Sequence, residues 1–317
     1  MIASTMSRKL INYITLTLKG MGMGAADVVP GVSGGTIAFI TGIYEELVNS
    51  IKSIDAGALK NLIKDGIGAF WKKINGNFLT AVFLGILISI FSLAKLLEHL
   101  LRTHPILVWS FFFGLIIASA IYVARKITHW NMKKFTGIIG GILVAYIITE
   151  LTPAQTPEAS WFVFISGALA ICAMILPGIS GAFILLLLGK YQYIIEAVGD
   201  LNISVLGILI AGALVGIISF SNLLSWFLRK YHDLTIAVLA GFMIGSLNKI
   251  WPWKQTVSTF VDRHGEIQPL VQKKVLPSEF AAHTGQDPLL IQALILAATG
   301  FALIFIIEGI IHLKSRL

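Results

Sequence analysis

Two short stretches of the chain combine proline, glycine and serine in a pattern that can bind an anion. PGVSGG occupies positions 30–35 and PGISGA positions 177–182. Proline begins or ends a helix, while glycine permits positive φ and leaves backbone amides uncovered. Uncovered amides beside serine hydroxyls can cradle a phosphate or carboxylate, and close packing at small residues is the alternative. The predicted phosphate-binding residues in these motifs are Gly31, Ser33, Gly34, Gly35, Gly178, Ser180 and Gly181.

Several ionisable residues lie in or beside apolar stretches. Asp27 precedes the first motif in a segment where a carboxylate is costly, which makes it a functional candidate. It either carries a coupling proton or cation or caps the helix that follows, since Asp is a favoured cap. Glu45 and Glu46 are further coupling candidates, with interfacial solvation as the alternative. Arg102 and Arg229 are candidates for the phosphate headgroup or ordinary helix-end anchors.

The chain repeats itself. Besides the two motifs, further residues recur at two spacings. Gly20 and Gly167, Gly42 and Gly189, and Tyr44 and Tyr191 are 147 residues apart, as the motifs are, while Gly85 and Gly212, Ser92 and Ser219, and Gly114 and Gly241 are 127 apart. This pattern predicts two related halves, 1–151 and 152–317.

The elements that carry these residues are those of a membrane protein. Hydrophobic residues make up 56% of the chain and charged residues 13%, too apolar for a soluble domain. Stretches long enough to cross a bilayer are 78–101, 105–124, 135–149, 203–228, 234–250 and 289–311, the third being short. The predicted fold class is an all-α polytopic membrane protein.

Four other segments are expected to enter the membrane partly or to lie on it. The segments at about 20–50 and 161–193 are interrupted by their motifs and are predicted to be re-entrant, broken helical hairpins. Apolar residues at helical spacing in 10–19 and in 52–74 predict two amphipathic helices on the membrane surface.

Lysine and arginine positions predict the topology. The lysines of 52–74 place that segment in the cytoplasm, and alternation then places both termini there too. The loop 251–288 becomes external, although its basic residues make this the weakest agreement. Each half has one hairpin and three crossings, so the halves form an inverted repeat, an architecture typical of secondary transporters.

Other functional classes fit less well. The net charge of +8 sits at segment ends rather than on a basic face, so no nucleic-acid partner is expected. With one cysteine and no paired His/Asp cluster, we expect no metal site and no cofactor. GVSGG at 31–35 matches a serine-nucleophile pattern, yet the histidines lie in loops or near helix ends, so an intramembrane serine hydrolase is a minor alternative. We predict no enzyme; a transporter of a small soluble anion, or a channel, remains a rival.

The run GAADVVPGVSGGTIAFITGIYEELV at 24–48, with ILPGISGAFILLLLGKY in the second half, resembles a widespread prokaryotic membrane family associated with polyprenyl-phosphate, chiefly undecaprenyl-phosphate, transport. The resemblance covers essentially the whole chain. It implies a flippase-like protein of the cytoplasmic membrane that returns this lipid carrier from the outer to the cytoplasmic leaflet for cell-envelope synthesis. We expect the hairpin tips to hold the phosphate and the prenyl tail to stay among membrane lipids. The sequence determines neither the coupling proton or cation nor the oligomeric state.

Overall fold

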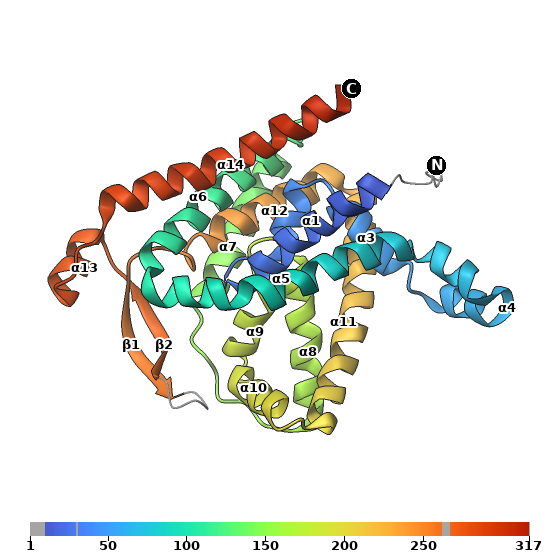
Figure 1. The fold of residues 1–317 in the computed structure, drawn as a ribbon, viewed down its shortest axis with the longest axis horizontal. Coiled ribbons are helices and arrows are strands. Elements are labelled where there is room, and N and C mark those ends of the chain that lie inside the picture. Colours follow the sequence, from blue (N-terminus) through green and yellow to red (C-terminus); the bar gives the residue numbers. More distant parts are fainter. Residues whose placement is uncertain (1–9, 30, 262–266, 317) are drawn as a thin grey trace.

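The computed structural model describes residues 10–29, 31–261 and 267–316, which are almost entirely helical (Figure 1). The elements up to residue 150 are α1 (Leu10–Val28), α2 (Gly34–Ile40), α3 (Tyr44–Lys52), α4 (Ala56–Lys73), α5 (Gly76–Thr103), α6 (Pro105–Ala124) and α7 (Met132–Glu150). They are followed by α8 (Ser160–Ile175), α9 (Gly181–Leu187), α10 (Tyr191–Gly199), α11 (Ile203–Lys230), α12 (His232–Ser246), β1 (Lys254–Val261), β2 (Ile267–Lys274), α13 (Pro277–Thr284) and α14 (Leu290–Arg316).

Five of the described helices are long and apolar enough to cross a bilayer, namely α5, α6, α7, α11 and α14. Five of the predicted spans are therefore confirmed by length and composition, while the sixth, 234–250, overlaps α12, a shorter helix of 15 residues. The predicted short span 135–149 is part of a longer helix of 19 residues. The reason is a cap: the side chain of Asn131 accepts a hydrogen bond from the Lys134 amide, so α7 begins at Met132.

The two broken segments have the same construction. A long helix, α1 or α8, ends before the motif, a seven-residue helix follows, and a second break leads into α3 or α10. The second break lies at Gly42 and Gly189, whose φ values of 74° and 61° end the short helices. α9 and α10 are bent by 111° and count together as a sixth possible span. The sequence prediction of one break per hairpin was thus incomplete.

The helices pair in a pattern that repeats along the chain. α1 packs on α5 as α8 packs on α11, and α6 packs on α14 as α7 packs on α12. Duplicated glycines lie at these crossings: a Cβ on Gly85 would overlap a carbonyl of α1, and one on Gly212 a carbonyl of α8. Likewise, a Cβ on Gly114 would overlap a carbonyl of α14, and one on Gly241 a carbonyl of α7. Small residues let the backbones touch, which is how helices associate in lipid.

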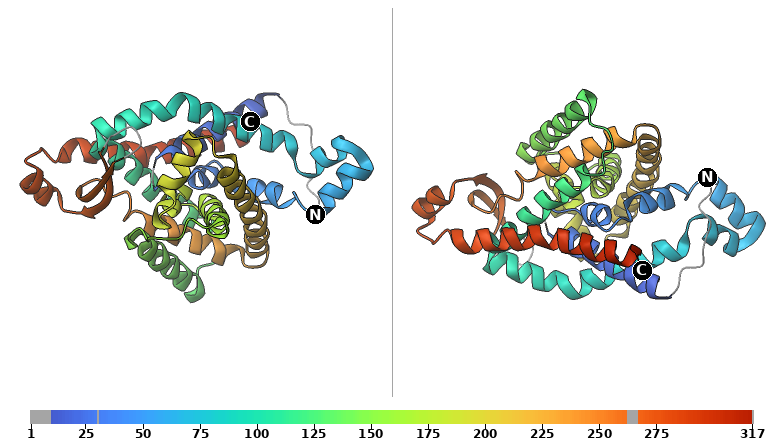
Figure 2. Two further views of the ribbon diagram at one scale, coloured as in Figure 1. Left: turned by 90° about the horizontal axis from the view of Figure 1, so that it is seen from below. Right: turned by 90° about the horizontal axis from the view of Figure 1, so that it is seen from above.

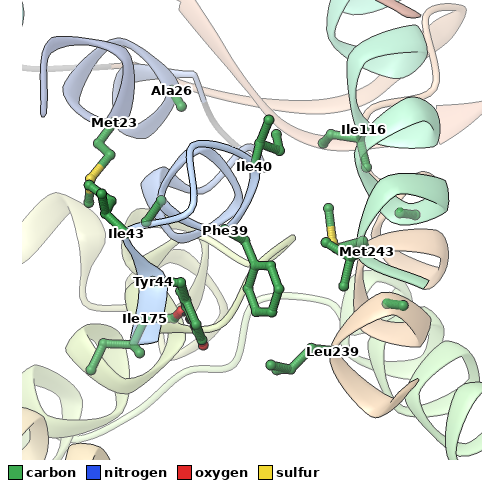
Figure 3. Close-up of a cluster of buried hydrophobic side chains, with 14 of the residues drawn as sticks. Met23, Ala26, Phe39, Ile40, Ile43, Tyr44, Ile116, Ile175, Leu239 and Met243 are labelled. Carbon is green, nitrogen blue, oxygen red and sulfur yellow. Dashed lines mark hydrogen bonds between the residues drawn. The ribbon is translucent and has the colours of Figure 1, made fainter. Parts of the chain in front are cut away.

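The centre of the molecule is an apolar cluster between the first broken hairpin and helices α6 and α12 (Figure 3). Phe39 and Tyr44 pack with ring centroids 4.5 Å apart, facing Ile116, Leu239 and Met243. The outer faces of α5, α7 and α11 instead expose large apolar side chains such as Phe91, Ile147 and Ile210. Such outward faces need a hydrocarbon environment.

Two further predictions concern the surface helices. Residues 10–19 do not form a separate surface helix, because they begin α1, and Leu16 and Gly20 are buried where α1 packs on α5. The amphipathic segment 52–74 does contain a helix, α4, which is broken at Gly66 (φ 82°). Ile63 and Ile67 of α4 are strongly exposed, as a surface helix on a membrane requires.

The predicted all-α class is wrong in the polar loop 251–288, so the fold is mostly rather than entirely helical. β1 and β2 form an antiparallel pair followed by α13. The indole N–H of Trp251 donates to the Val275 carbonyl (2.9 Å), and that of Trp253 donates to the Pro288 carbonyl (2.8 Å). Figures 1 and 2 show the strand pair and α13 at the end of the molecule opposite α4.

Candidate functional site

The interruptions of the two hairpins, called here the tips, are residues 31–33 and 176–180. Gly31 and Gly178 take up positive φ values of 89° and 94°, which reverse the backbone before each short helix. Pro30 lies outside the described residues. Each tip ends in a serine that caps the next helix: Ser33 Oγ accepts from the Gly35 amide (3.1 Å), and Ser180 Oγ from the Phe183 amide (3.2 Å). The local sequence thus dictates the same turn twice.

The two tips, far apart in sequence, bond directly to each other. The Gly31 amide donates to Ser180 Oγ (3.4 Å) and the Gly178 amide to Thr36 Oγ1 (3.2 Å). Ser33 Oγ donates to the Met174 carbonyl (3.0 Å). The hydroxyl of buried Tyr44 donates to the carbonyl of Ile175 (3.1 Å), at the end of α8. These four bonds hold the hairpins together as one central junction.

In this conformation the junction satisfies its own donors. The amides of Gly31, Gly34, Gly35 and Gly178 donate to side-chain oxygens of the protein, and the residues are buried. A Cβ on Gly181 would lie 2.7 Å from Met174 Cγ, so tight packing also accounts for a glycine there. Phosphate binding at the tips therefore stays a prediction, and it requires these amides to exchange partners.

Asp27 lies at the end of α1, just before the first tip, and contacts the helix that follows the tip. Its Oδ1 accepts a hydrogen bond of 2.7 Å from the Gly34 amide in the first turn of α2. A Cβ on Gly34 would overlap the other carboxylate oxygen. Asp27 thus accepts from the first turn of α2, the kind of bond that its predicted capping role requires, although the cap residue itself is Ser33. The coupling role stays a prediction.

The other predicted residues lie at helix ends outside the tips. Glu45 and Glu46 lie in the first turn of α3. Glu45 Oε1 lies 3.2 Å from His232 Nε2, and Glu46 Oε1 accepts from Asn75 Nδ2 (2.8 Å). Arg102 and Arg229 are exposed in the last turns of α5 and α11. Ion coupling and headgroup binding at these residues stay predictions.

A pocket of about 540 Å³ adjoins the junction. It lies between the end of α7, the helix α9, the residues after α12, and β2. Its wall contains Phe183, Leu186 and Leu187 of α9, Tyr146, Thr149, Glu150 and Leu151, and the polar residues Asn248, Lys249, Lys254, Lys273 and Lys274. We call it the lysine pocket.

Lys249 connects the lysine pocket to the tips. Its ammonium lies 4.3 Å from the centre of the Phe183 ring on α9. A Cβ on Gly31 would lie 2.9 Å from Lys249 Cγ, so the stem of this lysine covers the first tip. Sequence analysis singled out none of the pocket lysines as site residues. One feature of the sequence could have indicated them: the loop 251–288 is rich in lysine although the predicted topology makes it external.

Spanning helices together with two broken helices whose tips are in contact are typical of membrane transporters. Residues 23–268 match the family described as "Undecaprenyl phosphate translocase-like". The chain is 48% identical over 303 residues to a Vibrio cholerae protein named "Polyprenyl-phosphate transporter", covering 96% of this chain and 98% of that protein. It is 36% identical over 253 residues to a Staphylococcus aureus protein of the same name, covering 74% and 85%.

The chain belongs to this undecaprenyl phosphate translocase-like family, and the predicted family resemblance is confirmed. It is a multi-pass membrane protein of a transporter family and not an enzyme. No solved structure matches the chain.

Proposed function

We propose that this protein carries polyprenyl phosphate, chiefly undecaprenyl phosphate, from the outer to the cytoplasmic leaflet of a bacterial cytoplasmic membrane. The observation that carries the proposal is the 48% identity, over nearly the full length of both chains, to a protein named as a polyprenyl-phosphate transporter. The exposed apolar faces of α5, α7 and α11 support a substrate whose tail remains in lipid.

In this proposal the two halves are inverted repeats that alternate around the junction. The repeated helix pairs and the duplicated glycines at their crossings support it. So do the equal lengths of α5 and α11, each of 28 residues. α4 and the strand pair lie at opposite ends of the molecule, as cytoplasmic and external elements should (Figure 2).

The hydrogen bonds between the two tips can be replaced by bonds to a phosphate. Each bond between the tips contributes only about 0.5–1.5 kcal/mol net, because the groups exchange water or other partners when they separate. Bonds from amides to a charged phosphate are roughly twice as strong as neutral ones. A phosphate that takes over the Gly31 and Gly178 amides therefore compensates for the lost contacts of Ser180 and Thr36.

Inward movement of an anion opposes an inside-negative potential by about 2.3 kcal/mol per charge per 100 mV. A proton or cation that travels with the phosphate offsets this cost. Asp27 is the proposed site, because its carboxylate contacts the Gly34 amide beside the predicted phosphate-binding residues.

The test is reconstitution in liposomes with a labelled polyprenyl phosphate in the outer leaflet. We expect the wild-type protein to accelerate its arrival in the inner leaflet, and Ser33→Ala, Ser180→Ala and Asp27→Asn to slow it. Ser92→Ala is the matched control, because the Ser92 hydroxyl donates within its own helix, to the Ile88 carbonyl, on an exposed face. Movement equal to that in empty liposomes, under imposed pH and sodium gradients, would refute the proposed function and favour a soluble anion as substrate.

A further inference from the structure

We propose that the lysine pocket is the docking site for the substrate's phosphate group, with Lys249 and Lys254 as the anion-binding residues and the prenyl chain lying along α7. The proposal rests on the proposed function and names the place where the lipid first binds. In the predicted topology the pocket opens toward the outer leaflet, since it lies beside the loop 251–288.

The first observation is that two lysines of the pocket have no acidic partner among the described residues. Among the residues that the structure describes, neither Lys249 nor Lys254 forms an ion pair with an acid. The Lys254 ammonium instead lies 3.7 Å from the centre of the Trp109 ring. Enclosed cations without an anion are costly, so a bound anion would stabilise both.

Electrostatics at Lys254 agrees with this geometry. Burial, and then the positive charge of Lys249, holds the pKa of the Lys254 ammonium well below its usual range. A nearby anion would restore the charged form of this lysine. The site is therefore built to bind negative charge.

Lys126 provides a comparison within the same chain. Its ammonium also lies over aromatic rings, 5.2 Å from the centre of Phe39 and 5.1 Å from that of Tyr122. Burial lowers the pKa of the Lys126 ammonium, and the nearby carboxylate of Glu45 opposes part of this effect. At Lys254 the neighbouring charge is the ammonium of Lys249, which adds to the effect of burial instead of opposing it.

The rest of the wall leaves the pocket positive. Glu150, the one carboxylate among the wall residues that the structure describes, already pairs with Lys274 and accepts a hydrogen bond from Asn248 Nδ2 (2.6 Å). Lys274 also donates to Asn248 Oδ1 (2.9 Å). Lys273 adds an exposed ammonium to the wall. Because Glu150 pairs with Lys274, Lys249, Lys254 and Lys273 remain available to an added anion.

The second observation is the apolar surface beside the pocket. Tyr146 and Leu151 belong to its wall and are also 49% and 55% exposed. The same helix exposes Ile139, Leu143 and Ile147 further from the pocket. A phosphate in the pocket thus has a continuous apolar face for an attached hydrocarbon chain, which fits a lipid phosphate better than a free phosphate ion.

The path from this pocket to the tips is short. Lys249 contacts the ring of Phe183 on α9, and its stem covers Gly31. A phosphate bound to the Lys249 ammonium therefore lies next to the amides that the proposed mechanism needs.

The experiment measures binding separately from transport. Purified full-length protein in detergent is titrated with farnesyl phosphate, inorganic phosphate and farnesol, and thermal stabilisation gives each affinity. Wild type, Lys249→Gln, Lys254→Gln, Lys254→Met and the control Lys133→Gln are compared; Lys133 is exposed, carries the same charge and lies at the start of α7. Transport of a labelled polyprenyl phosphate is then measured in liposomes for each variant.

We expect farnesyl phosphate to stabilise the wild type and Lys133→Gln alike, with at least tenfold weaker affinity for the Lys249 and Lys254 variants. Lys254→Met should also be more stable than wild type without ligand, because an apolar side chain replaces an enclosed amine that forms no ion pair with an acid. This shows that lost binding is not lost folding.

The two proposals fail separately. Unchanged farnesyl phosphate affinity in both Lys249→Gln and Lys254→Gln would overturn the docking site, even with normal wild-type transport. Equal affinity for inorganic and farnesyl phosphate would overturn the lipid part of the proposal. If farnesyl phosphate binds the wild type through Lys249 and Lys254 but the wild type transports no polyprenyl phosphate, the docking site is supported and the proposed function is refuted.

Discussion

Removal of the Ser180 hydroxyl tests whether the bonds between the hairpin tips stabilise the fold. This hydroxyl accepts from the Phe183 amide (3.2 Å) as the cap of α9 and from the Gly31 amide (3.4 Å) of the other tip. Both amides are buried and lose their acceptor in Ser180→Ala.

The expected cost follows from these two losses. Loss of a serine cap costs about 1 kcal/mol, and a buried amide without a partner about 1–3 kcal/mol, with the lower end appropriate to a bond of 3.4 Å. Ser180→Ala should therefore lower the free energy of unfolding by about 2 kcal/mol. In Ser92→Ala the loss should stay within about 0.5 kcal/mol, because this serine is exposed.

The assay is reversible unfolding in mixed micelles, with increasing sodium dodecyl sulfate, followed by circular dichroism. A decrease of about 2 kcal/mol for Ser180→Ala alone supports the geometry of the junction. The reasoning is refuted if both serine variants unfold as the wild type does, since the bonds between the tips would then contribute nothing net.

Three further predictions concern other parts of the fold. Gly114→Ala should cost more than about 2 kcal/mol, because its Cβ would overlap a carbonyl of α14, whereas Gly140→Ala, with open space, should be neutral or slightly stabilising; thermal unfolding in detergent compares them. Tyr44→Phe should lose about 1–2 kcal/mol in the same assay, because a buried carbonyl of α8 loses its donor; a wild-type value would contradict this. Hydrogen bonds from Lys73 and the α4 backbone hold the pKa of the Asp55 carboxyl below its usual range. This stabilisation of α4 is present above the ordinary carboxyl pKa and lost as pH falls through the lowered one. The mobility of a spin label on α4 should rise on acidification in the wild type and be independent of pH in Asp55→Asn.

Several features could be predicted because their physical causes are local. Apolar runs such as 105–124 and 203–228 identify spanning helices by length and composition alone. The break at each motif follows from proline and glycine, since only glycine readily adopts the φ values of 89° and 94° seen at Gly31 and Gly178. The family followed from the same motifs.

The second break of each hairpin, after the short helix, was not predicted, because a single glycine in one hairpin is weak evidence for a break. Gly42 and Gly189 are single glycines in apolar runs, and a lone glycine is tolerated within a helix. Similarly, the apolar spacing of 10–19 fits a surface helix as well as the start of α1. Contact with α5 decides between the two, and no local pattern carries that contact.

The sequence by itself determined the bilayer as solvent, the positions of the spanning helices, the repeated motifs and the reversal of the backbone at each. These depend on the period of apolar residues and on the conformations open to proline and glycine. Only the tertiary structure decided which groups satisfy one another: Asp27 bonds to Gly34, Ser180 to Gly31, and Lys254 lies near Lys249 rather than a carboxylate. A polar residue's role depends on its neighbours in space, and the fold brings these together from segments far apart in the chain.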